Sequence, residues 1–387
     1  AGGVYMKRLL RIGFDIFITS LTPIIIWLLI GIIINKDLIN VFTLTYPLQC
    51  LMGIIVSIFG VGANVSGIKD KNENSVNNAI LYGTLISLFV FGIIALNCKY
   101  YIKFMNMNED IYLIFCTYSI LQILLQTIFY LIMNKLYYLE LNKYANKISF
   151  LFNFITFITL IGTALITKNQ VFSTSITIII LTIFDIILFI KNIGKIDFKI
   201  NLKNYFKYDS VSCSINFLYF IIYLFGFSNS FSFGQKYVTA ITFVTLITDV
   251  QWDVSSAIKN VAKIDIVKEK FIYTEHLKNA IKFILILIIS VILMGVLIYP
   301  IYNPDLSVVC IFVFLHIIDF IITPFKNIKM CYLEIEYSSL KTTINTLIAY
   351  IIRTIISLTP TPFCTIIGQI CSSIYELIYV KINYKNI

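Results

Sequence analysis

Apolar runs of about 20 residues recur along the whole chain, and short polar stretches separate them. As a helix, a run of this length crosses the hydrocarbon core of a bilayer, which is about 30 Å thick. The pattern therefore predicts an all-α integral membrane protein with twelve transmembrane helices. The expected spans are 12–34, 41–66, 77–98, 110–133, 147–167, 172–192, 210–230, 237–258, 279–300, 306–325, 340–358 and 361–382.

Composition strengthens this prediction. Hydrophobic residues make up 59% of the chain and charged residues 13%, whereas a soluble domain has about 25% charged residues. The formal charge is +10, but the lysines are spread over the connections, so we expect no nucleic-acid partner. The wealth of Ile, Asn, Lys and Tyr is typical of an AT-rich genome and suggests a bacterial origin. The residues AGGVY before Met6 look like a cloning remnant.

Lysine and arginine alternate between connections in a way that predicts orientation. Connections such as 191–207 and 259–278 are rich in lysine, and the connections between them hold few basic residues. Cytoplasmic loops carry this excess. We therefore expect a multi-pass protein of the cytoplasmic (inner) membrane with both ends in the cytoplasm, at 1–11 and 383–387.

A short internal repeat suggests how the spans are grouped. KLYYLEL at 135–141 and KMCYLEI at 329–335 share Lys, Tyr, Leu and Glu, and each follows the fourth span of its half. This predicts two parallel six-helix repeats around a central cavity: an N-lobe at 12–192 and a C-lobe at 210–382, joined by a cytoplasmic linker at 193–209. The alternative is a coincidence in a sequence rich in these residue types.

Motifs for other classes of activity are missing from the sequence. No phosphate-binding P-loop occurs, so we expect no ATP hydrolysis. The eight cysteines are scattered singly and no HExxH motif accompanies the two histidines, so we expect no metal and no cofactor. Nothing in the pattern indicates a catalytic site, and we expect that the protein is not an enzyme.

Several segments resemble the MATE (multidrug and toxic compound extrusion) family of the MOP flippase superfamily. They are ITSLTPIIIWLLIGIIIN (18–35), IFGVGANVSGIKDKNENSVNNAILYG (58–83), MNMNEDIYLIFCTYSIL (105–121) and LHIIDFIITPFKNIKMCYLE (315–334). The resemblance implies multidrug efflux by alternating access, with Na⁺ or H⁺ as the coupling ion. It also implies a functional carboxylate in the tenth helix, at the position of Asp319.

Asp319 is the strongest candidate for that site on its own chemistry. A carboxylate in the middle of an apolar helix is costly and normally faces a cavity or a partner. His316 lies three residues earlier, so both side chains share one helical face. Such a pair can exchange a proton or offer an oxygen to Na⁺. The alternative is a structural pair in which each group satisfies the other.

Asp249 and Asp253 form a second candidate. They are four residues apart on one face of the eighth helix, and two neighbouring acids disfavour joint ionisation, which favours binding of a cation. The alternative is a solvated cytoplasmic helix end. Weaker candidates are the other polar residues within spans, each of which could instead join helices or reach the membrane surface: Asp185, Glu376, Arg353, Asn64, Asn216 and Gln251.

Taken together, these patterns predict a MATE-like antiporter that exports hydrophobic, amphipathic or cationic small molecules. Its partners would be the cargo and the lipid bilayer, and we expect it to function as a monomer. Two alternatives stay open: a lipid-linked oligosaccharide flippase of the same superfamily, and a membrane protein that binds a ligand without transporting it.

Overall fold

The structure, a computed structural model, describes residues 2–70 and 72–384. These residues form helices joined by short connections, and no strand occurs among them. Twelve long helical segments appear in the described ranges, each at the place of one expected span. The segments are α1 (Gly2–Ile33), α2 (Val41–Val56) continued by α3 (Ala63–Asp70), α4 (Glu73–Leu96), α6 (Tyr112–Ile114) continued by α7 (Ile120–Tyr138), α8 (Asn142–Thr167), α9 (Gln170–Asn192), α10 (Leu202–Phe231), α11 (Gln235–Val267), α12 (Tyr273–Tyr302), α13 (Leu306–Tyr332), α14 (Ser339–Ser357) and α15 (Cys364–Tyr384).

Eight of these segments in the described residues are long and apolar enough, by length and composition, to cross a membrane. They include α4, α8, α9, α10 and α12. The segments α11, α14 and α15 have 33, 19 and 21 residues, so they are long enough as well, but they carry more polar side chains. The apolar part of α1 is the shorter stretch Ser20–Ile33.

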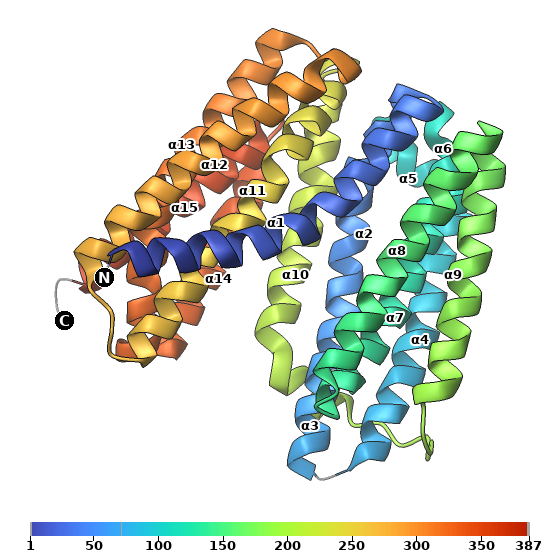
Figure 1. The fold of residues 1–387 in the computed structure, drawn as a ribbon, viewed down its shortest axis with the longest axis horizontal. Helices are drawn as coiled ribbons and strands as arrows, with labels where there is room; N and C mark the ends of the chain where they lie inside the picture. The colour runs from blue at the N-terminus through green and yellow to red at the C-terminus, as the bar shows by residue number, and fades with distance from the viewer. Residues whose placement is uncertain (1, 71, 385–387) are drawn as a thin grey trace. The chain divides into compact units, whose positions relative to one another are not determined.

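The helices group into two compact units, and α1 and α10 are each divided between the two (Figure 1). Unit 2 is Leu28–Leu224 and holds the end of α1, the helices α2 to α9 and most of α10. Unit 1 is Ala1–Trp27 together with Phe225–Ile387. These ranges differ from the lobes expected from the repeat, because the start of α1 groups with the C-terminal helices and the start of α10 with the N-terminal ones.

The non-helical part of the expected linker, residues 193–201, is held by hydrogen bonds to α4. Residues between α9 and α10 are not helical, but the amide of Asn77 on α4 donates to the carbonyl of Lys195 at 3.1 Å. The neighbouring Asn78 donates to Asp197 and accepts from its backbone N–H at 3.1 Å. The bond from Asn78 holds the pKa of Asp197 below its ordinary value. The start of α4 therefore fixes the path of this connection.

One close approach explains a glycine in unit 2. Gly62 ends the π-helical turn Ser57–Gly62 between α2 and α3. A Cβ on it would lie 2.2 Å from the backbone oxygen of Tyr205 at the start of α10. Any larger residue would displace backbone here, so glycine allows α10 to pack against this turn.

Candidate functional site

Two polar faces meet where α13 packs on α15 in unit 1. Each helix carries polar side chains at positions i, i+4 and i+7, a spacing that places them on one face. We call this contact the α13–α15 seam; its members are Asp319, Thr323, Lys326, Gln369, Ser373 and Glu376.

Asp319 lies at the centre of the seam and is 0% exposed. Gln369 donates its Nε2 to Oδ2 of Asp319 at 3.1 Å. The other carboxylate oxygen, Oδ1, has no hydrogen-bond partner among the described residues, and neither has Oε1 of Gln369. A buried carboxylate with one oxygen unpartnered keeps the capacity to bind a proton or a small cation.

Lys326 pairs with an acid from the opposite helix. Its Nζ lies 2.9 Å from Oε2 of Glu376 and donates to Oγ of Ser373 at 2.8 Å. The side chains of Lys326 and Glu376 are 11% and 15% exposed. α13 continues beyond the expected span end at 325, through Pro324 to Tyr332, and brings Lys326 into the packed helix.

Arg353, on α14, adds a second positive charge near the seam. It lies close enough to Asp319 and His316 to act on both electrostatically. With Asp319 ionised, the formal charges of Asp319, Lys326, Glu376 and Arg353 sum to zero. Neutralising Asp319 would leave one net positive charge.

His316 has a partner other than Asp319. Its Nδ1 accepts from Nε1 of Trp252 on α11 at 3.4 Å. The Trp252 ring also stacks on Phe320 of α13, with centroids 4.4 Å apart. No hydrogen bond found for the described residues joins His316 to Asp319. His316 therefore ties α13 to α11, while Asp319 ties α13 to α15.

The two acids of α11 lie in different environments. Asp253 is exposed and accepts from Oγ of Ser20 on α1 at 2.6 Å. Asp249 is half-buried and also has a partner. Whether the two act as a cation site stays a prediction.

Gln251, between these acids, joins α11 to α12. It is fully buried, and its Nε2 donates to Oγ of Ser290 at 3.1 Å and contacts Sδ of Met294 at 3.2 Å. This pattern is that of a polar side chain holding two helices together.

Two asparagines named as candidates from the sequence also join helices, both in unit 2. Asn64 on α3 donates to the carbonyl of Asn134 on α7 at 2.6 Å. Asn216 on α10 donates to Oγ of Ser57 at 3.5 Å, a weaker contact. Both bonds join segments that are distant in the sequence.

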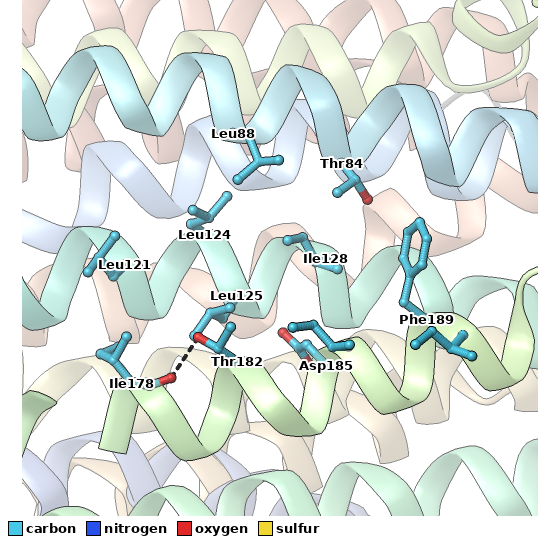
Figure 2. Close-up of a pocket in the computed structure, with 12 residues that line it drawn as sticks. Thr84, Leu88, Leu121, Leu124, Leu125, Ile128, Ile178, Thr182, Asp185 and Phe189 are labelled. Atoms are coloured by element: carbon cyan, nitrogen blue, oxygen red, sulfur yellow. Dashed lines mark hydrogen bonds between the residues drawn. The ribbon is translucent and has the colours of Figure 1, made fainter. Parts of the chain in front are cut away.

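Asp185 lies on α9 in unit 2 and is 3% exposed. Both of its carboxylate oxygens lack a hydrogen-bond partner among the described residues. It lines a cavity between α4, α7 and α9 (Figure 2).

A buried lysine in unit 2 was not among the candidate site residues from the sequence. Nζ of Lys135 on α7 lies 2.7 Å from both Oδ1 of Asn77 and the carbonyl of Asn192, and 3.2 Å from Glu73. Lys326 was not among those candidates either. The signal that could have revealed the seam is the i, i+4, i+7 polar spacing within two apolar spans.

The part of the chain that the structure describes contains no group of three or more His, Cys, Asp or Glu side chains that could hold a metal ion. What the seam offers instead is one buried carboxylate oxygen and one amide oxygen, both without partners.

Comparison with known proteins identifies the fold. No protein-family model matches the sequence, and no curated protein matches it significantly. Solved structures match over nearly the whole chain. An inward-facing multidrug resistance MATE family transporter of the MOP superfamily has a TM-score of 0.64 at 13% identity and covers 97% of this chain and 98% of its own.

Two further structures agree. An outward-facing MATE family transporter gives a TM-score of 0.58 at 13% identity, covering 99% and 96% of the two chains. A MOP superfamily transporter from Pyrococcus furiosus, described as having a binding pocket of reverse polarity that suggests a different function, gives 0.61 at 14% identity, covering 98% and 96%. The resemblance predicted from the sequence is therefore confirmed at the level of the fold, and so is the all-α multi-pass membrane architecture.

Proposed function

We propose that this protein is a secondary active transporter that exports hydrophobic, amphipathic or cationic small molecules in exchange for Na⁺ or H⁺. The observation that carries the proposal is Asp319, a fully buried acid with one oxygen unpartnered, in a fold shared with transporters. In this proposal Asp319 binds the coupling ion.

The side-chain amide of Gln369, beside Asp319, suits either coupling ion, H⁺ or Na⁺. Gln369 donates to ionised Asp319, and its Oε1 has no partner. An amide presents a donor and an acceptor at one position. Gln369 can therefore accept from protonated Asp319 after rotating its terminal group, or offer Oε1 to Na⁺ beside Oδ1 of the carboxylate.

In this proposal, the change of charge at Asp319 couples ion binding to a change in the arrangement of the helices. Taken together, the seam and the neighbouring Arg353 are formally neutral while Asp319 is ionised. Binding of either cation at Asp319 leaves this group with one net positive charge, because Lys326 and Arg353 outnumber Glu376. A buried net charge is unfavourable, so the occupied and empty states favour different helix arrangements. His316 and Trp252 link the same helix to α11, through which such a change would reach the rest of unit 1.

The two alternative functions, flippase and non-transporting binding protein, require different residues or predict a different result. A flippase for lipid-linked oligosaccharides would need cations for the pyrophosphate, and the buried Lys326 and Lys135 each have a carboxylate beside them. This arrangement favours the antiporter. A membrane protein that only binds its ligand would show binding with no gradient-driven flux.

Flux measurements on the protein in liposomes test the proposal. Uptake of ethidium, a cationic dye, should follow an imposed Na⁺ gradient or an imposed pH gradient and should stop when an ionophore dissipates that gradient. Ethidium binding with no flux under either gradient would contradict transport. Flux that persists without any gradient would contradict antiport.

A further inference from the structure

A groove in unit 2 is separate from the seam and has its own unpaired acid. It has a volume of about 370 Å³ and lies between α4, α7 and α9. Figure 2 shows side chains from these three helices facing one another across it, with Asp185 on α9 turned toward α7. A cavity of this size accommodates a small organic ligand.

Three oxygens in the lining of the groove lack a hydrogen-bond partner among the described residues. They are both carboxylate oxygens of Asp185 and Oγ1 of Thr84, all of them buried. Buried polar atoms are normally hydrogen-bonded, and leaving one unpaired costs about 1–3 kcal/mol. A ligand with several N–H donors would satisfy the carboxylate of Asp185.

The rest of the groove is apolar. Leu88, Leu124, Leu125, Ile128 and Phe189 form much of its wall. Leu88 and Ile186 are exposed on the surface of unit 2, so the groove opens there to its surroundings. None of the other lining residues carries a charge, and so the wall itself provides no cation for Asp185.

Apolar side chains line the groove on both sides of Asp185 along α9. Ile178 lies seven residues before Asp185, about 10 Å away at the rise of a helix, and Phe189 follows one turn after it. Figure 2 shows Ile178 and Leu121 at one end of the groove, Asp185 in its middle part and Phe189 beyond it. The lining therefore suits a molecule with one small cationic group and an aliphatic body that extends from it toward Ile178.

We propose that the groove between α4, α7 and α9 binds a monocationic amphiphile of the alkylammonium class. Its ammonium group donates to Asp185 and Thr84, and its chain packs along Leu88, Leu124 and Ile128. The proposal concerns binding to unit 2 alone. It does not depend on ion coupling at Asp319, so either could fail without the other.

Photolabelling tests the site directly. The probe is dodecylammonium with a diazirine in its chain, added to the purified full-length protein in detergent, and mass spectrometry locates the label. We expect label on α4, α7 and α9 near the groove, and at least a tenfold loss of that label in Asp185→Asn. Unlabelled dodecylammonium should compete with the probe and 1-dodecanol should not.

Two variants keep the result interpretable. Asp305→Asn, an acid-to-amide change at the exposed start of α13, should leave the groove label unchanged. Leu124→Trp should fill the apolar part and abolish the label while Asp185 stays in place; thermal melting confirms that each variant is folded. Equal labelling of wild type and Asp185→Asn, or equal competition by 1-dodecanol, would overturn the proposal and indicate a groove that takes any aliphatic chain.

Discussion

The Lys326–Glu376 pair allows a quantitative test of the seam. Both side chains are largely buried, at 11% and 15% exposure, so neither charge is strongly screened by solvent. Lys326→Met leaves Glu376 as an uncompensated buried charge, and such a change costs about 3–5 kcal/mol. Glu376→Met should cost a similar amount, because it removes the carboxylate whose Oε2 lies 2.9 Å from Nζ of Lys326.

The double variant Lys326→Met/Glu376→Met removes both charges and leaves apolar side chains in their place. Replacing a buried pair in this way is often neutral or stabilising, so the double variant should lie within about 1 kcal/mol of the wild type. The measurement is equilibrium unfolding in mixed micelles, followed by circular dichroism.

A nearby lysine provides the control for this comparison of the single and double variants. Lys329 lies one turn further along α13 and sits over the ring of Tyr273, with Nζ 5.2 Å from its centroid. Lys329→Met should therefore cost only about 0.5–1 kcal/mol. If the losses of the two single seam variants simply add in the double variant, the pair contributes no coupling and the account of the seam is wrong.

Two further predictions concern unit 2. Gly62→Ala would place a Cβ 2.2 Å from the backbone oxygen of Tyr205 and should destabilise the protein by about 1–3 kcal/mol in thermal melts. The control Gly92→Ala, with open space around it, should be neutral or slightly stabilising. Equal effects of the two variants would contradict the close approach at Gly62. The pKa of Asp197 is held below its ordinary value by the bond from Asn78. The ionised Asp197 therefore stabilises the connection 193–201 at neutral pH, and this stabilisation is lost as pH falls through the lowered pKa. Hydrogen exchange of the 193–201 amides, corrected for intrinsic rates, should show this loss of protection in wild type and not in Asp197→Asn.

The number and place of the helices could be predicted from the sequence because hydrocarbon thickness and apolar run length decide them. Each of the twelve runs became a long helical segment. The ends were less predictable. The expected span ended at 325, whereas α13 continues through Pro324 to Tyr332, so Lys326 lies in the packed helix and takes part in the seam.

The candidate site was predictable only in part, for a related reason. A charge within an apolar run is visible in the sequence, so Asp319 and Asp185 were both identified. Their surroundings depend on which helix faces meet. Gln369 is 50 residues from Asp319, and no local pattern joins them. His316 was close enough in sequence to suggest a pair, but the packing of α11 gave it Trp252 instead.

The most direct test of ion coupling compares three proteins in liposomes: wild type, Asp319→Asn and the matched control Asp305→Asn. The control should conserve the helix cap, because asparagine also caps helices well. The account predicts that gradient-driven ethidium flux falls at least tenfold in Asp319→Asn and is kept in Asp305→Asn. Wild-type flux and ion dependence in Asp319→Asn would contradict the proposal that this carboxylate binds the coupling ion.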